Sequence, residues 1–151
     1  MKLTLFTDYA MRVLLYLGAR PEQLCSIAEV AQSYRISQNH LMKVVSRLAA
    51  IGYVESVRGR HGGIRLGLAA EDINIGALVR QTEEGLDLVD CGSCVVAPAC
   101  GLTGVLKEAM RAFLGVLDRY TLADLLASRR DLARLFDLPA TDFAAPRSLE
   151  H

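Results

Sequence analysis

Three cysteines lie within ten residues of one another, and they are the side chains in this sequence best suited to chemistry. They are Cys91, Cys94 and Cys100, with glycine and proline around them. Three is an odd number, so they cannot all be paired in disulfides, and a cytosolic chain would not keep a structural disulfide there. Closely spaced thiolates bind soft metals. We therefore predict that this loop binds a metal or a metal cluster.

The identity of the metal stays open on these residues alone. A structural zinc site needs four ligands, and no fourth Cys or His lies near the loop, because the three histidines are at positions 40, 61 and 151. Iron–sulfur clusters are also held by closely spaced thiolates, and a non-thiolate ligand makes them reactive. A cluster is the favoured interpretation, with zinc or metal-free redox thiols as alternatives. Cys25 stands alone, and we predict that it is a small buried apolar residue.

The charge of the chain is divided unevenly. The 151 residues carry 17 basic and 17 acidic side chains, a net charge of zero that argues at first against nucleic acid. Residues 1–70 contain nine basic and four acidic side chains, a net of +5, and the remainder therefore has a net of −5. A basic half favours a nucleic-acid partner, although chance clustering on a solvated surface would look similar.

Several classes of protein are excluded or disfavoured. The longest apolar run, residues 13–19, is far short of the roughly 20 residues that span a bilayer, and no export leader opens the chain. We expect a cytoplasmic protein with no membrane partner. No Ser/His/Asp set, carboxylate pair or nucleotide motif is present, so we do not expect an enzyme.

The basic half has the pattern of a helix-turn-helix. Thr7 is predicted to cap a first helix. Ser26 and Glu29 have the spacing of a capping box, which starts a short second helix. After a tight turn, Ser37 is predicted to cap a third helix, and Gly52 to end it. In a helix-turn-helix the second of the paired helices enters the major groove of DNA.

A basic hairpin follows that helix. Residues 53–57 and 64–66 alternate like strands around a glycine-rich tip, which is typical of a wing, and no GxxxxGK[ST] pattern supports a nucleotide loop instead. Asn and Gln pair with adenine in the major groove, and Lys and Arg suit phosphate or guanine. The predicted DNA-binding residues are Ser37, Gln38, Asn39, His40, Lys43, Arg47, Arg58, Arg60, His61 and Arg65.

A long amphipathic stretch follows the cysteines. Apolar residues recur at three- and four-residue steps from 102 to 119. Such a helix beside a small domain needs a partner surface, and a two-fold dimer is the commonest one, although packing within the chain is the alternative. The predicted fold class is mainly α with a small β-hairpin wing, a winged helix-turn-helix plus a long dimerisation helix.

This pattern divides the chain into four parts. We predict a DNA-binding domain over 1–80, a cluster-binding loop region over 81–101, and the dimerisation helix with a C-terminal helix over 102–135. Residues 136–151 are predicted to be a flexible tail, and residues 149–151 look like the remnant of an expression tag.

Four segments together resemble one family. The sequences LFTDYA at 5–10, SQNHL at 37–41 and VRGRHGGIRLG at 57–67, with the three-cysteine loop, resemble the Rrf-type winged-helix transcriptional regulators over residues 1–135. The resemblance implies a homodimer with an iron–sulfur cluster in each protomer. It also implies repression of double-stranded promoter DNA that is relieved when the cluster is attacked.

The resemblance also implies a fourth ligand. In the nitric-oxide-sensing branch, an aspartate near the start of the first helix of the other protomer completes the cluster, and the matching residue is Asp8. In the cluster-homeostasis branch a histidine follows the third cysteine, where this sequence has residues 102–104, Leu-Thr-Gly. The resemblance thus favours a repressor with nitric oxide as its effector. The cluster-homeostasis or redox branch and a zinc-bound structural regulator are alternatives.

Two further expectations concern the cluster and its ligand. A 4Fe–4S cluster is favoured, but only two residues separate Cys91 from Cys94, a tighter spacing than the family's. Because a tighter loop can alter the cluster type, 2Fe–2S is the alternative. Arg12 lies four residues after Asp8, and we predict an ion pair between them in the cluster-free form.

Overall fold

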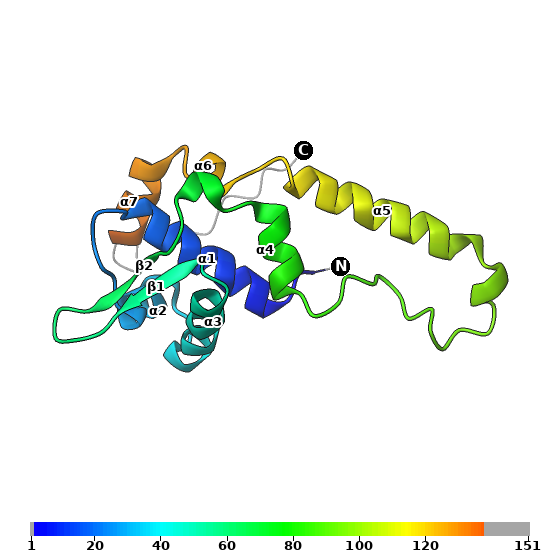
Figure 1. Ribbon diagram of the computed structural model, residues 1–151, viewed down its shortest axis with the longest axis horizontal. Helices are drawn as coiled ribbons and strands as arrows, with labels where there is room; N and C mark the ends of the chain where they lie inside the picture. The colour runs from blue at the N-terminus through cyan, green and yellow to red at the C-terminus, as the bar shows by residue number, and fades with distance from the viewer. Residues whose placement is uncertain (1, 138–151) are drawn as a thin grey trace, which may run out of the picture.

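The computed structural model describes residues 2–137, which form a helical body with one two-stranded sheet and one projecting arm (Figure 1). The fold class is as predicted. In chain order the elements are α1 (Leu5–Ala19), α2 (Ile27–Tyr34), α3 (Gln38–Ala50), β1 (Val54–Val57), β2 (Gly63–Leu66), a 3₁₀ turn (Ala70–Asp72), α4 (Ile75–Thr82), a second 3₁₀ turn (Ala97–Ala99), α5 (Gly101–Leu117), α6 (Leu122–Leu125) and α7 (Arg129–Asp137).

The body is assembled around α1. Val13 and Leu14 of this helix are completely buried, and α2, α3, α4, α6 and α7 all contact it. From α3, Leu41 and Leu48 enter the same core, and Leu122 enters it from α6. A single core therefore joins the helix-turn-helix to the C-terminal helices.

The start of α1 differs from the prediction. Thr4, not Thr7, is the N-cap, and its hydroxyl accepts a hydrogen bond from the backbone N–H of Thr7. Thr7 is completely buried, and its hydroxyl donates to Oγ1 of Thr82 at 2.9 Å. The prediction was wrong because both threonines can cap a helix, and a partner 75 residues away engages the second one.

The helix-turn-helix follows its local signals closely. Ser26 and Glu29 form the predicted capping box, with reciprocal side-chain to backbone hydrogen bonds. Ser37 occupies the N-cap position of α3, but within the described chain its hydroxyl makes no capping bond. After α3, Gly52 has a φ of +87°, the left-handed conformation expected of a glycine that ends a helix.

The hairpin β1–β2 is antiparallel and is fastened at its base. The pairing runs from Val54 opposite Leu66 to Val57 opposite Gly63. Cys25 exchanges two backbone hydrogen bonds with Ile64, at 3.0 and 2.8 Å, and is buried as predicted. Burial raises the pKa of the Cys25 thiol, so it stays protonated and apolar. The wing is therefore anchored to the segment between α1 and α2.

The arm consists of the segment 83–100 and α5. Figure 1 shows the chain leaving α4, running outward to the tip of the arm and returning along α5 to the body. Leu114 is the only buried residue of α5, whereas Leu102, Val105 and Val116 are exposed. The helix has an apolar face that the rest of residues 2–137 does not cover.

The C-terminal helix α7 returns to the body. Phe136 packs against the rings of Tyr16 and Tyr34, with centroids 4.9 and 5.2 Å apart, and Arg20 pairs with Asp137 at 2.7 Å. Helix α7 thus extends two residues beyond the predicted start of the tail. The rest of that tail, with the proposed tag remnant, lies outside the described residues.

Candidate DNA-binding face and cysteine loop

Helix α3 separates buried from exposed residues cleanly. Leu41, Val44, Val45 and Leu48 face the core. The predicted contacts on this element, Ser37, Gln38, Asn39, His40, Lys43 and Arg47, are all exposed. Ser37 to His40 gather at the N-terminal end of the helix, the end that reads base edges in helix-turn-helix proteins. The N-terminal end of α3 therefore carries hydrogen-bond donors and acceptors, and Lys43 and Arg47 add positive charge one and two turns further along the helix.

The wing supplies a second group of exposed basic side chains. Arg58, Arg60 and His61 lie at its tip and are all exposed. Gly62 is required there because a Cβ at this position would lie 2.1 Å from the carbonyl oxygen of Val57. The hairpin can therefore turn tightly enough to present its arginines together.

Arg65 is exposed, but its charge is partly offset. Its guanidinium pairs with the carboxylate of Glu55, directly opposite on β1, at 2.8 Å. The hydrogen bond from Arg65 lowers the pKa of Glu55. The register of the hairpin could have predicted Glu55 as the ion-pair partner of Arg65, because oppositely charged residues often face each other across two paired strands.

The DNA-binding face and the cysteine loop lie far apart in one chain. In Figure 1 the wing is at one end of the long axis, and the segment that carries the cysteines is at the other. An effect of the loop on the DNA-binding face thus requires either a path through the body or a second copy of the chain.

The cysteines are free thiols on a loop of short turns. Within the described residues none is in a disulfide, Cys94 is exposed, and Cys91 and Cys100 are partly exposed. Asp90 orders the start of the loop by accepting the backbone N–H of Gly92 at 2.9 Å and the hydroxyl of Ser93 at 2.7 Å. These bonds, the one from the Ser93 hydroxyl foremost, lower the pKa of Asp90.

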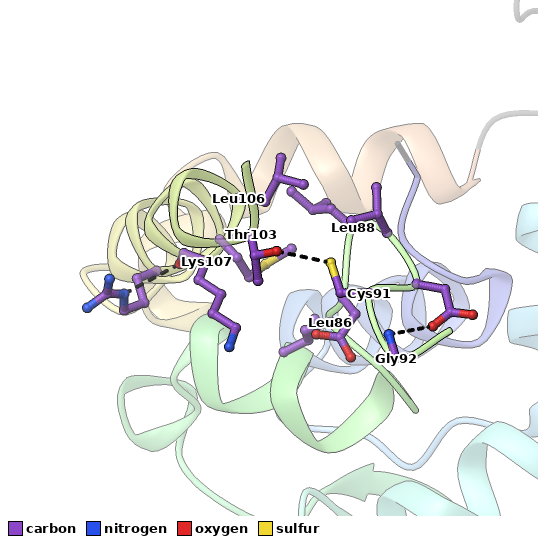
Figure 2. Close-up of a pocket in the computed structure, with 12 residues that line it drawn as sticks. Leu86, Leu88, Cys91, Gly92, Thr103, Leu106 and Lys107 are labelled. Atoms are coloured by element: carbon purple, nitrogen blue, oxygen red, sulfur yellow. Dashed lines mark hydrogen bonds between the residues drawn. The ribbon is translucent and has the colours of Figure 1, made fainter. Parts of the chain in front are cut away.

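A cavity of about 940 Å³ lies between this loop and α5. Figure 2 shows Cys91 with its sulfur directed toward the hydroxyl of Thr103, at 3.5 Å, and Leu88 of the loop and Leu106 of α5 line the same cavity. The thiol therefore faces a hollow surface rather than the core of the body.

The three thiols match an iron–sulfur cluster in donor chemistry but are not assembled into a ligand set. Within residues 2–137, no three His, Cys, Asp or Glu side chains are gathered closely enough to hold a metal ion. Soft thiolates are nevertheless the ligands that such clusters require. Large side chains of the loop are in solvent, with Val95 95% exposed, so packing does not hold the loop in this arrangement. The three cysteines therefore fit an iron–sulfur cluster in chemistry, and the loop has to bring their sulfur atoms together to bind it.

Asp8 is engaged within its own helix. Its carboxylate receives Arg12 in a two-bond arrangement, with Nε at 3.0 Å and Nη2 at 2.9 Å, which confirms the predicted ion pair. The Arg12 guanidinium also lies over the ring of Tyr34, at the C-terminal end of α2, 5.6 Å from its centroid. Arg12 therefore contacts both Asp8 and Tyr34, so a change at Asp8 can affect α2 through this one side chain.

Residues not expected from the sequence join the start of α1 to the start of the loop. Glu83, immediately after α4, accepts hydrogen bonds from the backbone N–H and the hydroxyl of Thr4, at 2.8 and 3.0 Å. Burial alone would raise the pKa of Glu83, but the nearby Thr7 side chain and the two hydrogen bonds from Thr4 outweigh it and lower the pKa. No local signal could have found this contact, since it spans 79 residues.

A helix-turn-helix with a basic wing defines a DNA-binding transcriptional regulator. Residues 3–128 match the family described as "Rrf2: Iron-dependent Transcriptional regulator", and the chain belongs to this family. It is a transcriptional regulator and not an enzyme. No helix among the described residues is long and apolar enough to cross a membrane.

Relatives and solved structures agree with this assignment. The chain is 52% identical over 144 residues to the HTH-type transcriptional regulator NsrR of Bacillus subtilis, covering 91% of this chain and 99% of that protein. It is 50% identical to NsrR of Geobacillus kaustophilus, covering 89% and 96%. The structure of T. potens IscR has a TM-score of 0.71 at 26% identity, covering 85% and 88%. That of CymR, the global cysteine regulator of B. subtilis, has a TM-score of 0.70 at 27% identity, covering 85% and 98%.

Proposed function

We propose that this protein is a homodimeric repressor that binds promoter DNA through α3 and the wing and is released by nitric oxide acting at an iron–sulfur cluster. The observation that carries the proposal is the set of three free thiols, Cys91, Cys94 and Cys100, on an arm of a DNA-binding protein. The name NsrR, borne by relatives of about half-identical sequence, supports the assignment. The cluster is 4Fe–4S in this proposal, with 2Fe–2S as the alternative.

The exposure of the ten DNA-binding residues supports the first part of the proposal. All ten are accessible, and most are basic or able to hydrogen-bond with bases. The net charge of +5 over residues 1–70 adds attraction to phosphate. The acidic remainder of the chain would be repelled by DNA, so the dimer would approach DNA with one side only.

The uncovered face of α5 supports the dimer. Leu102, Val105 and Val116 are 55%, 61% and 46% exposed on one helix. A contiguous apolar face of this kind is typical of an interface, and a second copy of α5 would cover it. A two-fold dimer also presents two copies of α3 to successive major grooves.

The proposed cluster ligands are the three thiols of one chain and Asp8 of the partner subunit. When bound, the cluster supplies iron that reacts with nitric oxide. In the cluster-free chain the carboxylate of Asp8 is bound to Arg12, so it must leave that pair before it can serve as a ligand. Arg12, whose guanidinium lies over Tyr34, then loses its carboxylate partner. The proposal therefore links the use of Asp8 to the environment of α2.

The proposal is tested by spectroscopy and DNA binding on the same anaerobic sample. We expect a brown protein whose visible absorption changes on adding nitric oxide and whose affinity for promoter DNA falls at the same time. In Asp8→Ala we expect the cluster to form but DNA affinity to respond weakly to nitric oxide. Asp72→Ala is a matched control, since it removes an exposed carboxylate from the same predicted domain, residues 1–80.

Three outcomes would contradict the proposal. Unchanged DNA binding and unchanged nitric-oxide response in Asp8→Ala would exclude Asp8 from the coupling. A colourless protein containing zinc would replace the sensor with a structural zinc regulator. A cluster whose redox state or occupancy, rather than nitric oxide, controls DNA binding would favour the cluster-homeostasis or redox branch.

A further inference from the structure

One exposed side chain on α3 differs in chemistry from its neighbours. Met42 is 51% exposed, and it is the only large apolar residue of this helix that is exposed. Met42 is not among the buried residues of α3, which face the core on another side of the helix. Packing among the residues that the structure describes therefore does not account for a methionine at this position.

The helix places Met42 beside the residues predicted to read bases. It lies four residues after Gln38 and three after Asn39, so the three share one side of the first turns of α3. Side chains of a helix lean toward its N-terminus. The thioether of Met42 therefore covers the surface next to the amide groups of Gln38 and Asn39.

The major groove offers one apolar group to such a side chain. Each base edge there presents hydrogen-bond donors and acceptors, and only thymine adds a methyl group, at C5. A methionine side chain is flexible and polarizable, so it can adapt its contact to that methyl. We propose that Met42 is a specificity-determining residue that packs against the 5-methyl group of a thymine adjacent to the base read by Gln38 or Asn39. This inference rests on the proposed DNA-binding role of α3.

Thymine-to-deoxyuridine replacement isolates this contact because it removes only the methyl group. The full chain, purified anaerobically, is first used to select a tight-binding duplex from random-sequence DNA. Each thymine of that duplex is then replaced singly by deoxyuridine, and the dissociation constants are compared. At the usual transfer free energy of a methyl-sized group, we expect one replacement in each half-site to weaken binding by wild type about fourfold.

Two variants complete a cycle with that replacement. Met42→Ala removes the contact from both protomers, so it should bind the thymine duplex about as weakly as wild type binds a duplex with deoxyuridine at the sensitive position of both half-sites. It should lose no further affinity on that doubly replaced duplex. Met42→Leu should restore part of the sensitivity to the methyl group. Lys43→Ala, one residue along, should weaken binding to both duplexes equally and reduce the dependence on salt.

The outcomes separate this inference from the proposed function. Tight binding of the selected duplex with no sensitive thymine, or with equal sensitivity in wild type and Met42→Ala, would overturn the role of Met42 alone. Failure of wild type to prefer any duplex over competitor DNA would overturn the DNA-reading role of α3 and this inference with it. Thermal unfolding of Met42→Ala should match wild type, because the side chain is half exposed.

Discussion

Replacing Gly62 by alanine should disable the wing while leaving the body folded. The added Cβ would lie 2.1 Å from the carbonyl oxygen of Val57 and 3.0 Å from that of Gly59. Cβ atoms do not approach other atoms closer than about 3.0 Å, so the tip must move by nearly 1 Å. Both obstructing atoms belong to the backbone, and no side-chain rotation can relieve the contact.

The cost of this movement can be worked out from the tip itself. The turn bond from the Gly62 N–H to the Gly59 oxygen, 3.0 Å long, would be strained or lost, at about 1 kcal/mol. Arg58 and Arg60 on the same tip would lose their common orientation. Each lost phosphate contact changes the slope of log K against log salt by about 0.9, so losing both should flatten it by about two units per protomer.

The assay is DNA binding measured over a range of salt, beside thermal unfolding. We expect Gly62→Ala to bind DNA weakly with the flattened slope, and its unfolding midpoint to fall by less than about 5 °C, since the tip is exposed. Gly59→Ala is an informative comparison, because its φ of +113° is unfavourable for alanine but no atom obstructs its Cβ. Gly85→Ala, with open space around it, should behave as wild type. A wild-type slope in Gly62→Ala would refute the argument that the tip orients the arginines.

Other regions of the molecule yield further predictions. Phe136→Ala should lower the free energy of unfolding by about 2 kcal/mol, because it removes a partly buried ring from contact with two tyrosines. Chemical denaturation measures this change. A change below about 0.5 kcal/mol would mean that α7 does not stabilise the body. The lowered pKa of Glu83 adds stability that is present above about pH 4.3 and is lost as the pH falls through the folded-state value. Glu83→Gln should therefore flatten the acid side of the stability–pH curve, and an unaltered curve would contradict this. Arg60→Ala should flatten the salt slope of DNA binding by about one unit per protomer, and a slope equal to wild type would mean that Arg60 contacts no phosphate.

Elements whose signals lie within a few residues were predictable. The capping box of Ser26 and Glu29 and the ending of α3 before Gly52 are local, because each depends on hydrogen bonds or dihedral angles inside one turn. The ion pair of Asp8 with Arg12 is of the same kind. The exposure of the residues predicted to read bases followed from the spacing of the apolar stripe on α3.

Contacts between distant segments were not predictable in the same way. Thr4 and Thr7 are equivalent as capping residues, and only Thr82 and Glu83, delivered by α4, distinguish them. Glu83 directly follows α4, and nothing in the neighbouring sequence indicates that its carboxylate accepts hydrogen bonds from Thr4 at the start of α1. The exposed methionine of the recognition helix was missed too, because apolar residues on a short helix are ordinarily expected in the core.

The sequence by itself determined the chemical character of the protein. Residue type and spacing alone set the three cysteines, the basic first half and the polar start of α3. These features decide that a soft metal and a nucleic acid are suitable ligands. Only the tertiary structure decided where these parts lie. It placed the wing at one end and the segment that carries the cysteines at the other, and among residues 2–137 it left one apolar face of α5 uncovered. Such placement depends on which surfaces bury one another, a property of the whole core that no short segment contains.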